Sequence, residues 1–339
     1  MNNNNQIRNL GEIRLIKLIE ELVLKKTGKV LLSDDSFFFN LKDENLDDNI
    51  ILNSDMLVSS TDVPPQMSFY QIGRKSVIMN VSDLVVKSVK PSGIIISLGL
   101  PKDLRKEDFI DLITGIIDSC VKFGIDYIGG DINETKELII NPTVFGFKNP
   151  LDIIYRKGIK VNDILVVNKK FGLTGVGFNI LLDKKGELKD FKDYERSIRS
   201  VLEPDIPGNE AFVLSKKKFA TSSIDSSDGL SKSLKDLMLS NPEIGFEIYF
   251  NEDLIDLEAI QYTKEFNISL EKLVFNGGEE FNHLFGLNPK DFNAAKKAIK
   301  AKGGQIFKIG NVISKDKIYI LKKGKVKELN SYGFEHFSK

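Results

Sequence analysis

Aspartate and glutamate side chains recur in this sequence at the expected ends of strands and at the starts of loops. They are Asp34 with Asp35, Asp55, Asp131, Asp225 with Asp228, and Glu279 with Glu280. Each lies next to glycine, serine or asparagine, where the backbone can approach a ligand closely. Taken singly, each carboxylate is typical of a turn or a helix N-cap. Taken together, they suggest one cleft that gathers them.

Carboxylates that converge in a cleft need positive charge between them. Two of them ~5 Å apart repel by roughly 3 kcal/mol at an effective dielectric constant of 20. Hard oxygen ligands without histidine or cysteine nearby favour Mg²⁺ or Ca²⁺ over zinc. Because Mg²⁺ keeps water and phosphate oxygens in its coordination shell, the pattern predicts a magnesium site that works on a nucleotide.

The usual nucleotide-binding signatures are absent from the sequence. It contains no Gly-x-x-x-x-Gly-Lys-Ser/Thr run, and the loop with Gly172, Gly175 and Gly177 has the wrong glycine order for a dinucleotide fingerprint. That loop precedes an expected helix, so its amides either hold a phosphate or form a packing turn. With only His283 and His336 present, a Ser-His-Asp hydrolase is hard to build. We expect His283 to pack or face solvent rather than act as a base.

Composition describes a globular enzyme without a strong overall charge. Hydrophobic residues make up 41% of the 339 residues and charged residues 28%, which argues against global disorder. Lysine plus arginine number 48, as do aspartate plus glutamate, so no global field favours nucleic acid or an anionic membrane. Apolar runs such as 94–98 are far shorter than the ~20 residues that cross a bilayer.

Cysteine usage bears on the compartment. Cys120 is the single cysteine, which excludes an intrachain disulfide and a thiolate metal cage within one chain. Its place inside an expected helix predicts a core residue. Together with the lack of a secretory signal, this favours a reducing, cytoplasmic location.

The elements that must position the carboxylates do not alternate strictly between strand and helix. Helices are expected at 15–28, 71–89, 107–123, 175–182, 194–202, 210–217, 229–239 and 289–302. Strands are expected at 50–52, 94–100, 126–128, 138–147, 163–167, 222–224 and 245–250, with a terminal hairpin that turns at Gly324. The order predicts an α+β fold rather than a doubly wound parallel sheet. The length favours two domains, and Asn149-Pro150 places their boundary between 1–148 and 149–339.

Eight short motifs carry a resemblance to a known family. They are Ser33-Asp34-Asp35, Ser54 to Val58, Asn80-Val81-Ser82-Asp83-Leu84, Gly129-Gly130-Asp131, Arg156-Lys157-Gly158 with Asn162-Asp163, Ile224 to Leu230, Gly277-Gly278-Glu279-Glu280 and Gly333 to Phe337. In this order they resemble the thiamine-monophosphate kinases, of the aminoimidazole ribonucleotide synthetase superfamily, over nearly the whole chain. The segment 60–65, followed by Gly73-Arg74-Lys75, is similar to the archaeal branch.

The resemblance implies a fold, an assembly and a reaction. The expected fold is an N-terminal α/β domain, whose sheet pairs with that of a second copy to form a dimeric β-barrel, and a C-terminal α+β domain. The expected reaction transfers the γ-phosphoryl group of ATP directly to thiamine monophosphate, in a homodimer that needs Mg²⁺. Such transfer depends on alignment and charge neutralisation, which suits a chain so poor in histidine.

The resemblance also assigns roles to individual residues. The implied metal ligands are Asp35, Asn53, Ser54, Asp55, Asp83, Asp131, Asp225 and Asp228. The implied nucleotide contacts are Gly130, Asp131, Arg156 and Ser227. The implied substrate contacts are Asp62, Glu279 and Phe334, the last an aromatic ring that suits a cationic thiazolium. Asp55, Asp131 and Arg156 are expected to carry catalysis.

Several departures from the family pattern leave alternatives open. Asp62 stands where many bacterial members have a histidine, and Glu280 with Asn282 alters the residues after Gly-Gly-Glu. Lys87-Ser88-Val89 replaces a run of small residues and could crowd the helix packing. A second reading therefore keeps the ATP site but changes the acceptor, as in a synthetase of the same superfamily. A third reading is an ATP-binding scaffold without turnover.

Overall fold

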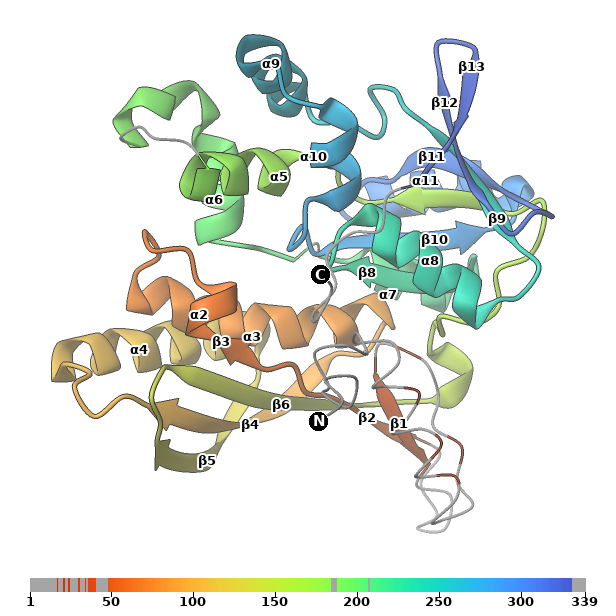
Figure 1. Cartoon of the computed structure of the whole chain (residues 1–339). Coiled ribbons are helices and arrows are strands. Elements are labelled where there is room, and N and C mark those ends of the chain that lie inside the picture. Colours follow the sequence, from red (N-terminus) through yellow and green to blue (C-terminus); the bar gives the residue numbers. More distant parts are fainter. Residues whose placement is uncertain are drawn as a thin grey trace, which may run out of the picture.

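The computed structural model describes residues 17, 21, 24, 30, 34, 36–40, 48–183, 188–206 and 208–330. Within these residues the chain forms two β-sheets, each with its own helices, one above the other in Figure 1. The helix predicted at 15–28 lies mostly outside the described residues.

The first sheet has the strand order β1-β2-β6-β4-β5, with β3 beside β6. Its strands are β1 (Phe37–Asn40), β2 (Asn49–Asn53), β3 (Leu57–Val58), β4 (Pro91–Leu100), β5 (Asp126–Glu134) and β6 (Ile139–Lys148). Only β4 and β5 pair in parallel among these. The helices α3 (Phe69–Val86) and α4 (Lys106–Phe123) lie on one face of this sheet (Figure 1), after the short α2 (Ser59–Asp62).

Local sequence explains where α3 begins and how closely it packs on α4. Ser68 accepts a hydrogen bond from the Gln71 amide, and the Gln71 side chain accepts one from the Ser68 amide, which forms a capping box. A Cβ on Gly73 would lie 2.1 Å from the Leu112 carbonyl oxygen. The two helices therefore pack backbone against backbone.

The alternation of buried and exposed residues in β4 shows that one face of the first sheet is covered. Ile94, Ile96 and Leu98 are buried beneath the helices, whereas Ile95 and Ser97 are exposed on the opposite face. This opposite face carries the polar residues described below.

The second sheet has the strand order β13-β12-β9-β11-β7-β10-β8. Its strands are β7 (Ile164–Val167), β8 (Ala220–Ser226), β9 (Gly245–Tyr249), β10 (Asn282–Leu287), β11 (Phe307–Ile313), β12 (Ile318–Lys322) and β13 (Lys325–Glu328). The helices of this half are α5 (Leu173–Phe178), α6 (Glu195–Leu202), α7 (Glu210–Lys216), α8 (Leu230–Ser240), α9 (Leu257–Phe266), α10 (Leu270–Asn276) and α11 (Phe292–Lys300).

Helices cover both faces of the second sheet. Leu165 and Val167 of β7 belong to the hydrophobic cluster that includes α8 and α10, and Ile164 and Val166 to the cluster that includes α7 and α11. A strand with helices on both sides reads as a continuous apolar run, which explains why β7 was recognisable in the sequence.

The α+β class is confirmed, since nearly all strand pairs are antiparallel and helices do not alternate with strands. Two strand predictions were too short. β5 continues through Gly129 and Gly130, and β8 includes Asp225, so Asp131 and Asp225 lie inside strands rather than after them. The elements α9, α10, β10 and β11 were not predicted.

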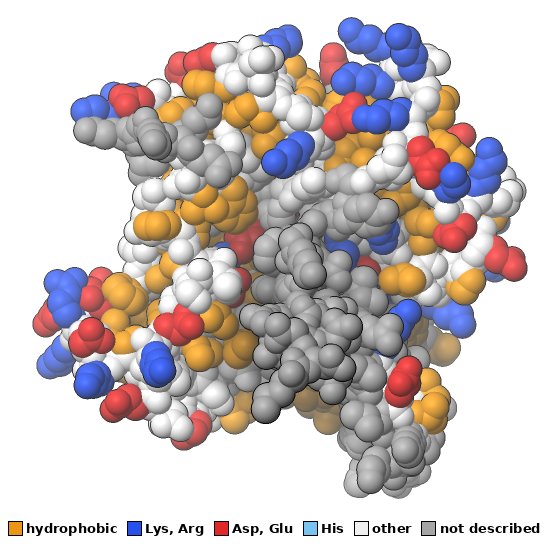
Figure 2. Space-filling model, in the orientation of Figure 1, with side chains coloured by type: hydrophobic (Ala, Val, Ile, Leu, Met, Phe, Trp, Pro, Cys, Tyr) orange, Lys and Arg blue, Asp and Glu red, His pale blue; other side chains and the backbone are white. Residues whose placement is uncertain are grey.

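All strands of the first sheet precede residue 149 and all strands of the second follow residue 163. We propose a domain boundary at 148/149 on this basis. None of the described helices combines the length and apolarity that a membrane span needs. Charges of both signs are interspersed over the face seen in Figure 2, as the equal numbers of basic and acidic residues predict.

Candidate functional site

Helix α3 lies at the contact between the two halves of the molecule and carries the predicted metal ligand Asp83. Ser82 donates a hydrogen bond to Asp225 Oδ2 on β8, with an oxygen-to-oxygen distance of 2.7 Å. Asp225 and Asp83 are only 5% and 8% exposed. Residues far apart in sequence therefore meet at α3.

Two of the predicted metal ligands flank a third. Asn53, at the end of β2, donates through Nδ2 to Asp55 Oδ2 at 3.0 Å and to Asp83 Oδ2 at 2.7 Å. Asn80 fixes this loop, because its Oδ1 accepts from the Asp55 amide at 2.7 Å. The positive end of the Asn53 amide thus lies between two carboxylates, which marks a place where positive charge is stabilised.

Ser54 and Asp131 lie on the exposed face of the first sheet. Ser54 Oγ donates to the Pro142 carbonyl at 2.9 Å and accepts from Thr143 Oγ1 at 3.0 Å. Asp131 on β5 pairs with Ser97 on β4, which pairs in turn with Asn141 on β6. Ser97, Asn141 and Thr143 therefore form a polar row between Ser54 and Asp131, and Asp131 is not in direct contact with the Asp55 cluster.

The ligands available to a metal ion around Asn53 are few. Within the described residues, no three or more histidine, cysteine, aspartate or glutamate side chains are grouped closely enough to hold a metal ion. Asp55 and Asp83, with the nearby oxygens of Asn53 and Ser54, instead offer a few hard ligands. Such a set suits Mg²⁺, which commonly takes one or two carboxylates and completes its shell with water and phosphate.

Arg156 and its neighbours tie the second half to the start of the first sheet. The Arg156 amide donates to Asp34 Oδ2 at 2.9 Å, and Lys87 Nζ lies 2.9 Å from Asp34 Oδ1. Lys87 is fully buried and also donates to the Ser223 carbonyl at 2.9 Å. Lys87 is thus a buried ion-pair partner that the sequence reading missed.

Two loops of the second half lie against each other at this contact. Ser227, which is exposed, accepts a hydrogen bond from the Glu279 amide at 2.5 Å through its carbonyl oxygen. Asp228 follows, and Gly229 caps α8 with φ at 97°, where no side-chain cap is present.

Gly130, a predicted nucleotide contact, lies on β5 of the first sheet. A Cβ on Gly130 would lie 1.7 Å from the Ile96 carbonyl oxygen, so glycine is required there.

The predicted substrate residues Asp62 and Glu279 are brought together by Lys75. Its ammonium group, 1% exposed, lies 2.5 Å from Glu279 Oε1 and also 2.5 Å from the Asp62 carbonyl oxygen. The Asp62 carboxylate itself accepts from the Val58 amide at 2.7 Å. Burial raises the pKa of Glu279, and Lys75 acts in the opposite direction. Sequence reasoning missed Lys75, although it lies inside the motif at 73–75.

Asp35 and Phe334, a predicted metal ligand and a predicted substrate contact, lie outside the described residues.

The glycine loop is a packing turn, because Cβ atoms on Gly175 and Gly177 would lie 2.5 and 2.2 Å from backbone oxygens of other elements. Its Gly172 and Thr174 amides donate to Glu280. His283 is buried in β10 and Cys120 in α4, so both are core residues as predicted.

Comparison with known proteins places this arrangement in a family. Residues 33–147 match the family model "AIR synthase related protein, N-terminal domain". A thiamine-monophosphate kinase of Nitrosopumilus maritimus is 34% identical, over 97% of this chain and 99% of its own length. One of Methanocaldococcus jannaschii is 30% identical over 90% and 94%.

A solved structure, AaThiL complexed with AMPPCP and TMP, superposes with a TM-score of 0.83 at 23% identity, over 99% of this chain and all of that one. The predicted aminoimidazole ribonucleotide synthetase-like fold is thereby confirmed. This fold, together with sequence identities of 34% and 30% over nearly the whole chain, shows that the chain belongs to the thiamine-monophosphate kinase family.

Proposed function

We propose that this protein is a thiamine-phosphate kinase that uses ATP to convert thiamine monophosphate to thiamine diphosphate. The supporting observations are the 34% identity to a thiamine-monophosphate kinase over 97% of the chain and the AaThiL complex with AMPPCP and TMP. The geometry that carries the proposal is the Asp55 and Asp83 pair about Asn53, with Asp225 held nearby through Ser82.

The reaction requires little covalent help from the protein. A phosphate oxygen of thiamine monophosphate attacks the γ-phosphorus of ATP, and the bond from that phosphorus to the bridging oxygen breaks. The electron pair leaves with ADP. Because the acceptor is already an anion at neutral pH, no general base is needed, and the protein contributes alignment and charge neutralisation.

Charge neutralisation is proposed to depend on Mg²⁺. When bound, the metal neutralises charge on the phosphate oxygens. We assign Asp55 and Asp83, with Asn53 and Ser54, as ligands of one Mg²⁺ ion, and Asp35, Asp131, Asp225 and Asp228 as ligands of further Mg²⁺ ions. Asp55 is anchored by Asn80 and by the end of β2, so its carboxylate is held before any ligand arrives.

Nucleotide binding is proposed for Gly130, Asp131, Arg156 and Ser227. Asp131 is exposed on the sheet face, and Ser227 is exposed on the loop before α8. Arg156 carries the cation, and its backbone is fixed from both sides by Asp34 and by Asn241, whose Nδ2 donates to the Arg156 carbonyl at 3.1 Å.

Substrate binding is proposed for Asp62, Glu279 and Phe334. Lys75 holds Asp62 and Glu279 in one place, and the carboxylate of Glu279 suits the positive thiazolium ring of the acceptor. Many bacterial members have a histidine at the position of Asp62. In this chain Lys75 contacts both the Asp62 carbonyl oxygen and the Glu279 carboxylate, which supports a shared role of these residues in binding the acceptor.

We further propose a homodimer formed by the exposed face of the first sheet. Ile95 of β4 and Phe147 of β6 are exposed apolar residues on this face, and the edge strand β5 exposes Tyr127, Ile128 and Ile132 beside it. Such patches mark interaction surfaces. Light scattering should give twice the chain mass, and Ile95→Asp should give monomers; a wild-type monomer at the same concentration would refute the dimer.

We place the enzyme in the cytoplasm, since its substrates are small soluble phosphates and its one cysteine, Cys120, is a buried thiol.

The alternative function is transfer from the same ATP site to another acceptor. Measuring ADP release with thiamine monophosphate, thiamine, aminoimidazole ribonucleotide and its formyl precursor distinguishes the two functions. The proposal expects release with thiamine monophosphate alone. Release with another acceptor, and none with thiamine monophosphate, would overturn it.

A further inference from the structure

A cavity of about 790 Å³ lies beside Glu280, and none of the predicted site residues lines it. Basic side chains dominate its polar wall: Arg74 from α3, Lys122 from α4, Lys169 and Lys170 after β7, and Arg196 and Arg199 from α6. Its volume is in the range of small-molecule sites. The proposed kinase reaction makes no use of it.

Half of these cations are already neutralised by ion pairs. The pairs are Arg196 with Asp256 at 2.8 Å, Arg199 with Glu203 at 3.0 Å, and Lys122 with Asp205 at 2.6 Å. By contrast, Arg74, Lys169 and Lys170 form no ion pair with a carboxylate of the described residues. The remaining carboxylate of the lining is Glu280, so the cavity keeps an excess of positive charge.

Lys169 and Lys170 are held in place by contacts that leave their charge available. Lys169 Nζ donates to the Asp205 carbonyl at 2.8 Å, which uses one of its three protons. Burial lowers the pKa of Lys169, so a nearby anion would favour its charged form. Lys170 Nζ lies 5.5 Å from the centroid of the Phe307 ring, a cation–π contact that orients it.

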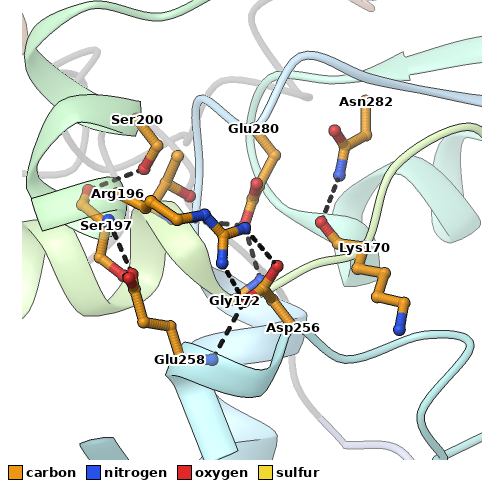
Figure 3. Close-up of polar contacts among 10 residues, drawn as sticks. Lys170, Gly172, Arg196, Ser197, Ser200, Asp256, Glu258, Glu280 and Asn282 are labelled. Atoms are coloured by element: carbon orange, nitrogen blue, oxygen red, sulfur yellow. Dashed lines mark hydrogen bonds and ion pairs between the residues drawn. The ribbon is translucent and has the colours of Figure 1, made fainter. Parts of the chain in front are cut away.

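The wall formed by α6 is preorganised. Figure 3 shows Arg196 pointing at Asp256, the N-cap of α9. Asp256 Oδ1 accepts from the Glu258 amide at 3.0 Å, and Glu258 Oε2 accepts from the Ser197 amide at 2.9 Å. These bonds fasten α6 to α9, so a ligand would meet a formed surface and spend little free energy on ordering it.

The rest of the lining supplies a carboxylate and apolar surface. Glu280 Oε1 accepts from the Gly172 amide at 2.7 Å (Figure 3) and from the Thr174 amide at 3.4 Å, and its charge also interacts with that of Lys169. Leu257 is 62% exposed, and with Phe307 it offers an apolar contact in the same cavity.

We propose that this cavity is a second ligand site, which binds a small molecule with a phosphate or other dianionic group. Arg74, Lys169 and Lys170 hold the anion, and Leu257 and Phe307 contact an apolar part of the ligand. An anion is favoured over a neutral ligand because three cations that form no ion pair with a described carboxylate line one partly enclosed space. Glu280 links the site to the kinase centre, since it directly follows Glu279.

Isothermal titration of the full chain with inorganic pyrophosphate tests the proposal. A chelator is present and ATP is absent, so that the carboxylates of the kinase centre repel the probe. Arg74→Gln with Lys170→Gln should weaken binding at least tenfold, with an unchanged circular dichroism spectrum. Lys106→Gln with Lys300→Gln, which removes the same charge from exposed positions outside the cavity, should change binding less than twofold.

Equal weakening by both double variants would overturn the proposal, because it would reveal only general charge attraction. Absence of pyrophosphate binding to the wild-type chain would overturn it as well. If the cavity double variant does not fold, Lys170→Gln alone replaces it, with an expected loss of about threefold or more against Lys300→Gln. Kinase turnover, measured separately without pyrophosphate, should persist in Lys170→Gln, which distinguishes this site from the proposed reaction centre.

Discussion

Glu279 and Glu280 are adjacent in sequence, yet they lie in two different regions, and each buried carboxylate is stabilised in a different way. Glu279 faces the candidate kinase site and has a buried lysine, Lys75, at 2.5 Å. Glu280 faces the basic cavity and is bonded to two backbone amides. Burial raises the pKa of Glu280 to about 7, with the amides acting in the opposite direction.

The difference teaches how one loop serves two sites. A full counter-charge maintains a buried carboxylate as an anion, whereas two neutral amides only reduce the cost of burial. The backbone makes this separation possible, because Glu279 and Phe281 have φ angles of 59° and 47°, which turn successive side chains in different directions.

The largest effect is expected at the acidic region. Asp55→Asn removes a carboxylate beside Asn53 without changing its size, and kcat should fall by about 10²–10³-fold, the usual cost of losing one electrostatic contact to a transition state. The melting temperature should stay close to that of the wild type. Asp103→Asn, at an exposed turn, is the matched control and should retain activity. Undiminished turnover by Asp55→Asn would remove the metal assignment.

The next effect concerns the counter-charge of Glu279. Lys75→Met leaves a buried carboxylate without its partner and should lower the free energy of unfolding by about 3–5 kcal/mol. Chemical denaturation measures this, and adding Glu279→Gln should recover part of the loss. Lys317→Met, which breaks an ion pair whose side chains are 52% and 41% exposed, should cost less than about 1 kcal/mol. A similar cost for both lysines would contradict the comparison.

Glu280 should give stability a pH dependence. Its folded pKa of about 7 lies above the ordinary value of 4.5, so unfolding releases a proton between these pH values. The free energy of unfolding should therefore fall as the pH rises from about 4.5 to 7, by up to about 3 kcal/mol, and then remain level with respect to this group. Denaturation of the wild type and Glu280→Gln at pH 5 to 8 measures the difference. Parallel profiles would show that Glu280 titrates normally.

The smallest effect is expected on the α6 wall. Arg196 is paired with Asp256, but its side chain is 62% exposed, so Arg196→Gln should lower the free energy of unfolding by less than about 1 kcal/mol. The same denaturation assay applies. If Arg196→Gln lowered the free energy of unfolding as much as Lys75→Met does, the stability of the cavity wall would depend on its charges as strongly as that of the acidic site, which would contradict the comparison.

Much of the fold was predictable because local signals agreed with the tertiary structure. The length of α3 and its Ser68 and Gln71 cap mark a helix, and the continuous apolar run of β7 marks a strand covered on both faces. Asp83 lies among the apolar residues of α3 and is buried. The helices α9 and α10 were missed although Asp256 and Ser269 cap them, because they are short, at 10 and 7 residues.

The partners of the buried lysines were not predictable from local sequence. Lysines are mostly exposed, and nothing near Lys75 indicates a partner, since Glu279 lies 204 residues away. Lys87 depends in the same way on Asp34, which is 53 positions earlier. The motifs therefore identified Asp62 and Glu279 as candidates, whereas only the fold revealed the cation that joins them.

Single-turnover transfer of labelled γ-phosphate from ATP to thiamine monophosphate tests the central claim most directly. The enzyme is kept in excess, and the reaction is run with Mg²⁺ and then with the metal chelated. We predict labelled thiamine diphosphate formed in one step with Mg²⁺ and none after chelation. Absence of this product with Mg²⁺, in a sample that binds ATP, would contradict the account and point to another acceptor.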